Sequence, residues 1–359
     1  MGFKCILVSL LVLLIGKIVH SGLLKRGEIL ESIDEAIQTS LNVDGIDPAN
    51  QKDYGVEVEG QDLKLTNEQR DMLHPHRKNV RRRRKAISAT RYRWTANTIP
   101  FEYNEYDFSD IEKAEVQKAM DLWAQETCIK FRKATASDKN KILFQTGKGG
   151  CNSWMGMVGG TQEVNLSKQG CRWLGVFLHE IGHAIGLVHE HQLPNRDTYI
   201  RVLWQNVDTA LTKWFDKYSS SYVNVYGTDY DYASVMHYGA KAFSGNGQNT
   251  METIDASKSN WMGNVNTKTL SFTDAKVVNQ MYKCAVNCPA VNCPSDGFID
   301  KNCNCITPKS YYDRHCINKH KSSSCDTWAT RGECALNPGW MSDNCRKSCD
   351  MCPKYGNYL

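Results

Sequence analysis

After its first 15 residues, the 359-residue sequence lacks any apolar run long enough to span a bilayer, which requires about 20 consecutive apolar residues. It also lacks a strong excess of charge. The formal net charge is +5, and two of the positive charges, Lys4 and Lys17, lie within the first 21 residues. A balance this close to neutral argues against nucleic acid as a partner. Hydrophobic residues at 41% and charged residues at 23% are ordinary for a globular protein.

Cysteine is absent between Lys25 and Thr127, although the chain has 15 cysteines. Cys5 lies in the N-terminal apolar run, and eleven others lie between Cys284 and Cys352. The remaining three lie in the middle of the chain, at Cys128, Cys151 and Cys171. The even number after Cys5 and the cysteine-dense tail are typical of a secreted chain whose C-terminal modules are held by disulfides.

The N-terminus has the order of a secretory signal peptide, which we expect over residues 1–21. An early lysine precedes the apolar run Cys5–Ile15, and small residues follow at Ser21 and Gly22. A membrane anchor is the alternative, but the run is short for a spanning helix. We therefore expect a secreted, extracellular product without a membrane span.

Residues 22–85 indicate a propeptide. The segment is rich in Asp, Glu and Asn, has few aromatic residues, and ends in five consecutive basic residues, Arg81 to Lys85. In a secreted chain this run predicts a cleavage site for a processing protease, so that the mature protein begins near Ala86. The alternatives are a solvated charge run and a patch that binds nucleic acid or heparin.

Residues 86–285 have the periodicity of one compact domain. Ser109, with Glu112 three residues later, predicts a capping box at the start of a helix, and apolar residues follow at helical spacing. Helices and strands mix without regular βα alternation, which favours an α+β fold. The other expected elements are strands over 141–147 and 161–167, a buried helix over 173–186, and a closing helix over 272–282 with Thr273 as its cap.

The string HEIGHAIGLVHEH, from His179 to His191, contains four of the ten histidines. His179 and His183 are four residues apart, so on a helix both project from one face and can offer a ring nitrogen to one zinc ion at about 2.0–2.1 Å. Glu180 lies about 100° around the helix from His179, beside the metal but not as a ligand. The short pattern alone has frequent chance matches.

Gly186 and His189 make the pattern more specific. On an uninterrupted helix, His189 would lie about 15 Å further along the axis than His179. A glycine can adopt a positive φ, end the helix and turn the chain back, which returns His189 to the metal. Three histidines leave one position of a tetrahedral zinc for water, as in catalytic sites. His191 falls outside this register, and we expect it to be exposed.

Water bound to such a zinc has a pKa near 7 instead of about 15.7. Glu180 is placed to accept its proton and to pass it to the leaving amine of a cleaved peptide bond. One alternative is an ordinary helix whose histidines bind no metal. Another is a structural zinc site, which needs a fourth protein ligand, and no candidate stands at suitable spacing.

HEIGHAIGLVHEH, together with SVMHYG at Ser234–Gly239, resembles the signature of the astacin family of zinc endopeptidases, within the metzincins. The resemblance covers about Ala86 to Cys284 and includes RYRW, TCIKF and the closing helix. It implies a two-subdomain metzincin fold, one zinc ion (Zn2+) per catalytic domain, and extracellular protein or peptide substrates. The chain differs from many astacins at Leu193–Asp197, a run that contains no zinc ligand.

The resemblance also implies roles for single residues. Met236 would form the tight turn beneath the zinc, and Tyr238 would reach the metal or the oxyanion; without the resemblance, both are buried core residues. Glu190 would anchor the new N-terminus at Ala86 through hydrogen bonds. Residues 151–160 would supply an edge strand to which a substrate adds. The implied disulfides are Cys128–Cys284 and Cys151–Cys171.

Leaders of this family carry an Asp that displaces the catalytic water, and VEGQDLKLT is similar, with Gln61 as an extra residue before Asp62. A block by a thiolate is excluded, because the leader after the signal peptide has no cysteine. Asp62 is therefore the candidate inhibitory carboxylate. The alternative is a solvated loop acid, since the leader holds many other carboxylates.

Residues 286–315 resemble part of an EGF-like module, and residues 316–352 resemble the ShK-toxin-like (ShKT) domain. Channel-blocking ShKT members have Lys-Tyr where this chain has Gly339-Trp340, which favours adhesion or substrate docking. Four cysteines of the first module allow three pairings, which stay open: Cys288, Cys293, Cys303 and Cys305. The ShKT resemblance implies the pairs Cys316–Cys352, Cys325–Cys345 and Cys334–Cys349.

Asn165-Leu166-Ser167 is a glycosylation sequon in an expected strand. Taken together, the sequence predicts a secreted zinc metalloendopeptidase made as a zymogen, with substrate and oligomeric state open. The alternative is a secreted binding or toxin-like protein that acts through its ShKT tail.

Overall fold

The structure, a computed structural model, describes residues 62–73, 86–87, 89–147, 149–263, 269–315, 318, 320–337, 340–341 and 344–349. The expected signal peptide, most of the expected propeptide and the basic run Arg81–Lys85 lie outside these residues. Within them, no helix combines the length and the apolar composition needed to cross a lipid bilayer.

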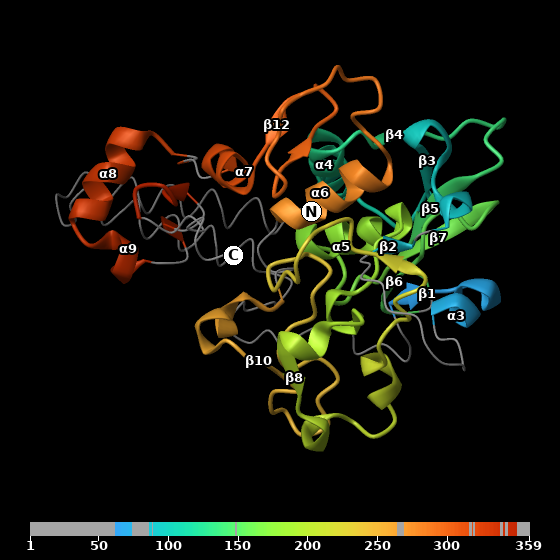
Figure 1. Cartoon of the computed structure of the whole chain (residues 1–359), viewed down its shortest axis with the longest axis horizontal. Coiled ribbons are helices and arrows are strands. Elements are labelled where there is room, and N and C mark those ends of the chain that lie inside the picture. Colours follow the sequence, from blue (N-terminus) through green and yellow to red (C-terminus); the bar gives the residue numbers. More distant parts are fainter. Residues whose placement is uncertain are drawn as a thin grey trace, which may run out of the picture. The chain divides into compact units, whose positions relative to one another are not determined.

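Alternating side chains build a six-stranded sheet (Figure 1). In the strand Lys141–Gln145, Ile142 and Phe144 are buried and their neighbours are half-buried, so one face of the sheet is covered. Neighbouring strands run parallel, except for the antiparallel pair Cys151–Trp154 and Thr161–Leu166. The spatial order is β1 (Leu63–Lys64), β6 (Cys151–Trp154), β7 (Thr161–Leu166), β5 (Lys141–Gln145), β3 (Thr98–Tyr103) and β4 (Lys130–Lys133).

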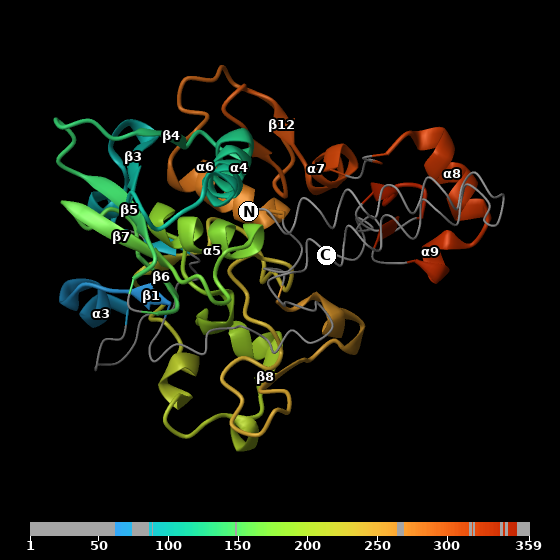
Figure 2. The same ribbon diagram turned by 180° about the vertical axis from the view of Figure 1, so that it is seen from behind.

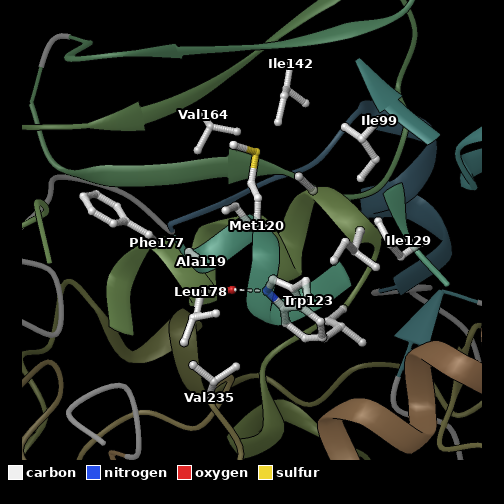
Figure 3. Close-up of a cluster of buried hydrophobic side chains, with 14 of the residues drawn as sticks. Ile99, Ala119, Met120, Trp123, Ile129, Ile142, Val164, Phe177, Leu178 and Val235 are labelled. Atoms are coloured by element: carbon white, nitrogen blue, oxygen red, sulfur yellow. Dashed lines mark hydrogen bonds between the residues drawn. The ribbon is translucent and has the colours of Figure 1, made fainter. Parts of the chain in front are cut away.

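Helices α4 (Asp110–Glu126) and α5 (Leu174–Ile185) pack against each other beside the sheet (Figures 1 and 2). The predicted capping box of Ser109 and Glu112 starts α4. Trp123 is fully buried, and its indole Nε1 donates to the carbonyl of Leu178 at 3.0 Å, which joins the two helices (Figure 3). All twelve residues of α5 are buried, so this helix is internal on every side. The combination of these helices with the mixed sheet confirms the α+β prediction.

The cap predicted for the closing helix α6 (Phe272–Met281) is wrong by two residues. Ser271, not Thr273, is the N-cap: its hydroxyl accepts from the backbone N–H of Asp274, whose side chain accepts from the N–H of Ser271. The Thr273 hydroxyl donates instead to the buried carboxylate of Asp231. Two hydroxyl residues within one turn made the cap ambiguous from sequence alone.

Residues after α5 form a second buried cluster in a region of short elements, with Phe215, Tyr218 and Met251 inside it. Leu63 and Leu73 of the leader belong to the same cluster. In Figures 1 and 2, α5 lies between the sheet and this region. The short elements and the leader helix are α3 (Asn67–Leu73), the pairs β2 (Ala86–Ile87) with β9 (Val223–Asn224) and β8 (Ile200–Val202) with β10 (Met251–Thr253), and the 3-10 turns Thr90–Tyr92, Thr95–Asn97, Glu190–Gln192, Arg196–Thr198, Trp204–Asn206, Thr212–Phe215 and Ala256–Trp261.

The segment after Cys284 begins with a small disulfide-linked unit that packs on α6 and α4. It contains the hairpin β11 (Phe298–Ile299) and β12 (Cys305–Ile306) and the helix α7 (Pro308–His315). Phe272 of α6 packs with Phe298 and Tyr311, and Arg314 binds the buried carboxylate of Glu126 at the end of α4. The C-terminal part contains α8 (Ser322–Thr330) and α9 (Glu333–Leu336).

Six disulfides lie among the described residues. The two pairs within residues 86–285 and two pairs of the C-terminal part are those that the family resemblances imply. The pairing of the first tail module, which the sequence left open, is Cys288 with Cys303 and Cys293 with Cys305. The expected pair Cys316–Cys352 lies outside the described residues. The six are Cys128–Cys284, Cys151–Cys171, Cys288–Cys303, Cys293–Cys305, Cys325–Cys345 and Cys334–Cys349.

Gly182, in the middle of α5, gives a test of how tightly this helix is packed. A Cβ atom there would lie 2.7 Å from the sulfur of Met236 and 3.4 Å from the ring of Trp123. We expect Gly182→Ala to lower the free energy of unfolding by about 1–3 kcal/mol, because overpacking outweighs the gain in helix propensity of about 1 kcal/mol. Urea titration monitored by circular dichroism measures it.

The same substitution in a Met236→Ala background is the control. Removing the sulfur should relieve the clash, so there Gly182→Ala should be neutral or stabilising. Equal destabilisation in both backgrounds would show that the contact with Met236 is not the cause.

Candidate metal centre

The helix α5 projects two histidines from one face, as their spacing predicts. His179 and His183 are both buried, and their ring centroids lie 4.6 Å apart. Glu180 is also buried, with 1% of its surface exposed. A helix that is internal on every side has thus placed three polar side chains where water does not solvate them, which costs free energy for any polar atom left without a partner.

Gly186 ends α5 in the predicted way. It adopts φ 120° in the left-handed region, and its N–H donates to the carbonyls of Gly182 and His183. The N–H of Leu187 then also donates to the carbonyl of Gly182, which reverses the chain. The turn brings the ring of His189 back, so that its Nε2 atom lies 3.1 Å from Nε2 of His183.

Each of the three rings is held through its other nitrogen. Nδ1 of His179 donates to the carbonyl of Val235 at 2.7 Å, and Nδ1 of His183 donates to the carbonyl of Leu187 at 2.9 Å. Nδ1 of His189 lies 2.9 Å from Oε1 of Gln192. Because these oxygens only accept, all three Nδ1 atoms carry a proton, and in the neutral rings the three Nε2 lone pairs point to one place. Such a set is repulsive by itself and suited to a cation.

Asp62 is the fourth member of the cluster. Its carboxylate oxygens lie 3.0 Å from Nε2 of His179 and 2.9 Å from Nε2 of His189. A tetrahedral zinc with ligands at about 2.0–2.1 Å requires ligand separations of about 3.3 Å, close to the observed values. Three imidazoles and one carboxylate therefore fit zinc in both chemistry and spacing.

Burial and charge together determine the protonation of this cluster. Although burial raises it, the histidines hold the pKa of Asp62 well below its usual value. Burial lowers the pKa of His183 to about 3, so its imidazole is neutral and able to bind metal at pH 7. Burial and then the Asp62 carboxylate raise the pKa of Glu180 well above its ordinary value. The site thus holds one charged carboxylate beside one that resists ionisation.

The expectation that His191 is exposed is wrong, because this ring is completely buried. Its Nε2 donates to the carbonyl of Trp214 at 3.2 Å, and its ring stacks on Tyr238 at 4.4 Å between centroids. Tyr238 in turn lies 4.5 Å from the ring of His189. Burial and the nearby Asp62 carboxylate raise the pKa of the Tyr238 phenol. His191 therefore fixes the position of Tyr238 beside the metal ligands.

The turn around Met236 supports the cluster from below. Met236 is buried, and its carbonyl accepts from the N–H of Glu190 at 3.0 Å. The carbonyl of the preceding Val235 holds His179, and the N–H of Val235 donates to the carboxylate of Asp274 at 3.0 Å. The hydroxyl of Ser234 donates to the same carboxylate at 2.6 Å. The N-terminus of α6 thereby orients His179, one of the candidate metal ligands.

Glu190 lies away from the metal, beside a small cavity. Its Oε1 accepts from the N–H of Asp231 at 2.7 Å, and the cavity is also lined by Ser234, Thr273 and Asp274. The cavity has room for roughly one water molecule.

Sequence reasoning missed two supporting residues. Gln192 stands three residues after His189, a spacing that suggests proximity, and its Oε1 also accepts from the Tyr218 hydroxyl at 2.7 Å. Asp274 carries no such signal, because it is far from the histidines in sequence and reads as part of a helix cap. Asn165 lies apart from the site; it is buried in β7, where its amide donates to Asn152 at 2.7 Å, and its glycosylation stays a prediction.

Two family models match the chain. Residues 86–283 match the astacin peptidase family, and residues 315–352 match the ShK domain-like family. Zinc metalloproteinase nas-15 of Caenorhabditis elegans is 33% identical over 280 residues, which are 72% of this chain and 47% of that protein. Blastula protease 10 of Paracentrotus lividus is 35% identical over 241 residues, 64% of this chain and 39% of that protein. The chain thus spans less than half the length of these curated relatives.

One solved structure is also similar to part of this chain. High choriolytic enzyme 1, a hatching enzyme zinc-protease from Oryzias latipes (medaka fish), has 32% sequence identity and a TM-score of 0.48. The match covers 53% of this chain and 92% of that chain.

Proposed function

The chain belongs to the astacin family, and from this membership we propose that it is a secreted zinc-dependent endopeptidase made as a latent precursor. The observation that carries the proposal is the convergence of three Nε2 lone pairs from His179, His183 and His189, each fixed by a hydrogen bond at Nδ1. These three residues would hold one zinc ion. When bound there, zinc would activate a water molecule and polarise the carbonyl of a peptide bond.

Glu180 and Tyr238 complete the proposed chemistry. Among the described residues, Oε2 of Glu180 is buried and has no hydrogen-bond partner, so this oxygen is free to take the proton of the attacking water. The same carboxyl then delivers the proton to the leaving amine nitrogen. Tyr238, held by stacking on His191, would donate its hydroxyl hydrogen bond to the developing oxyanion.

We place the substrate along β6, as an added strand. In the precursor, the leader occupies this position: Leu63 pairs with Ser153 and Lys64 with Trp154. The side-chain amide of Gln69 also donates to the carbonyl of Met155 at 2.8 Å. An extended peptide can take the same backbone hydrogen bonds only after the leader has gone.

Asp62 is the proposed cause of latency. Its carboxylate lies where the catalytic water would have to bind, within 3.1 Å of Nε2 of both His179 and His189. It also raises the pKa of Glu180, after the larger effect of burial, so its departure removes one of the two causes that disfavour the ionised carboxylate. Removal of the leader would therefore both free the position of the water and ease ionisation of the general base.

Cleavage after the basic run would start the mature chain at Ala86. This residue is already buried, and it forms a β-bridge to Leu187, next to the cavity beside Glu190. Glu190 and Asp274 would supply acceptors for the freed amine. A processing protease is thus the expected activator, and extracellular proteins or peptides are the expected substrates. The described disulfides support an oxidising, extracellular location.

Glu180→Gln in the mature chain tests the proposed function. We expect zinc-dependent hydrolysis of casein by the unmodified mature chain and a loss of roughly 10²–10⁴-fold in kcat/KM in the variant, because a general base is removed. Zinc content measured by mass spectrometry should stay at one ion per chain. Glu115→Gln, on the exposed side of α4, is the matched control and should keep full activity. Full activity of Glu180→Gln would contradict the mechanism.

Asp62→Asn in the uncleaved precursor tests latency. An amide keeps the size of the carboxylate but loses its charge, so its hold on the metal site weakens. We expect the variant precursor to hydrolyse casein roughly tenfold or more faster than the unmodified precursor, since 1.4 kcal/mol of lost binding is a factor of about ten. Asp71→Asn, an exposed carboxylate of the same leader segment, should leave the precursor latent. Equal latency of both variants would exclude Asp62 as the block.

A further inference from the structure

Three side chains form a row across the strands β1, β6 and β7. Lys64 pairs with Trp154. Between the antiparallel strands β6 and β7, Ser153 lies opposite Val164. One residue further along, this register places Trp154 opposite Glu163. Paired residues of neighbouring strands project to the same face, so all three side chains share one face of the sheet. Nζ of Lys64 lies 2.9 Å from a carboxylate oxygen of Glu163 and 5.8 Å from the centre of the Trp154 ring.

The row joins two parts of the chain that separate on activation. Lys64 belongs to the leader, whereas Trp154 and Glu163 belong to the peptidase domain. When the leader departs, Glu163 loses this cation and its side chain, already 43% exposed, faces the vacated strand position. The nearby lysine Lys141 is paired with Glu102 at 2.8 Å. An acidic group beside an indole face is thus left next to the position of the substrate.

We propose that Glu163 and Trp154 form a specificity subsite that selects a lysine or arginine side chain of the substrate. The inference rests on the proposed function and on the placement of the substrate along β6. The carboxylate attracts the cation, and the indole ring adds a cation–π contact. Lys64 of the leader shows how such a side chain fits, because it makes both contacts.

The geometry also locates the selected residue in the substrate. A strand added to β6 presents the side chain opposite Trp154 to the same face whether it runs parallel or antiparallel, so the direction of the substrate does not change the contact. Lys64 lies two residues after Asp62, whose carboxylate lies among the metal ligands. The basic residue therefore stands about two residues from the scissile bond, on a side that mapped cleavage sites will reveal.

Two features set the size of the preference. Glu163 is partly exposed, so solvent screens its attraction, and the indole contact is long. We expect kcat/KM for a peptide with lysine at this position to exceed that for the same peptide with methionine by roughly threefold to tenfold. The subsite thus ranks substrates and does not exclude those without a basic residue.

The experiment uses the mature, zinc-loaded chain and a fluorogenic peptide library, with cleavage sites mapped by mass spectrometry. Matched peptides with lysine, methionine or glutamate at this position are then measured with three variants. Glu163→Gln should bring the lysine-to-methionine ratio close to one, and Glu163→Lys should favour glutamate over lysine at the same position. Glu102→Gln, which removes a similar ion pair elsewhere in the sheet, should keep the original ratio.

A ratio of one in an unmodified chain that hydrolyses casein would overturn the subsite and leave the proposed function intact. A mature chain that binds zinc but cleaves no peptide would overturn both. An equal loss of preference in Glu163→Gln and Glu102→Gln would also contradict the subsite, because the effect would then be general.

Peptide binding gives a second test that does not require turnover. A labelled peptide of residues 62–73 is bound to the mature Glu180→Gln chain and followed by fluorescence anisotropy. Lys64→Met in the peptide should weaken binding by roughly threefold to tenfold, and the loss should disappear when the chain also carries Glu163→Gln. Equal affinity of the two peptides for the Glu180→Gln chain would contradict the subsite.

Discussion

Three hydrogen bonds at Nδ1 hold three imidazole lone pairs toward one point, and the rest of the domain is arranged around this constraint. Val235, Leu187 and Gln192 each supply the acceptor for one ring. Leu187 and Gln192 belong to the segment that carries the histidines, whereas Val235 comes from a distant turn that needs its own support. Like-oriented lone pairs at 3.1 Å repel one another, so the fold stores an arrangement that only a cation or acidic protons relieve.

The supports explain why distant segments matter for a site formed by thirteen consecutive residues. The turn at Gly186 makes the carbonyl of Leu187 available and returns His189 to the cluster. Asp274, at the start of α6, fixes the turn that contains Val235. The small tail module packs on α6 through Phe272, so the C-terminal segment stabilises the helix that anchors a metal ligand. Positional precision at the metal thus depends on packing far from it.

In the proposed latent precursor, the leader would use the same two features that a substrate needs: an oxygen at the metal and an added strand. Asp62 satisfies the first and the pairing of Leu63 and Lys64 with β6 satisfies the second. On this proposal, a segment of a dozen described residues would suffice to block the site. The proposed subsite follows from the same segment, since Lys64 contacts both Glu163 and Trp154.

The sequence predicted the parts of the site that depend on local periodicity. Spacing of four placed His179 and His183 on one helix face, and a glycine at the end of the helix returned His189. Failures occurred where the outcome depends on tertiary contacts. His191 was expected in solvent, but the chain after Gly186 packs it under Trp214 and against Tyr238. Ser271 and not Thr273 caps the closing helix, because the Thr273 hydroxyl donates its hydrogen bond to Asp231. Asp274 could not be linked to the histidines from sequence, because it acts indirectly: its carboxylate accepts from the backbone N–H of Val235, whose carbonyl holds His179.

The most direct measurement of the central claim is X-ray absorption at the zinc edge of the mature chain with one equivalent of zinc. The account predicts three imidazole nitrogens and one exchangeable oxygen at about 2.0–2.1 Å, and no sulfur. Fewer than three imidazoles bound to the metal, or the absence of any exchangeable oxygen, would contradict it.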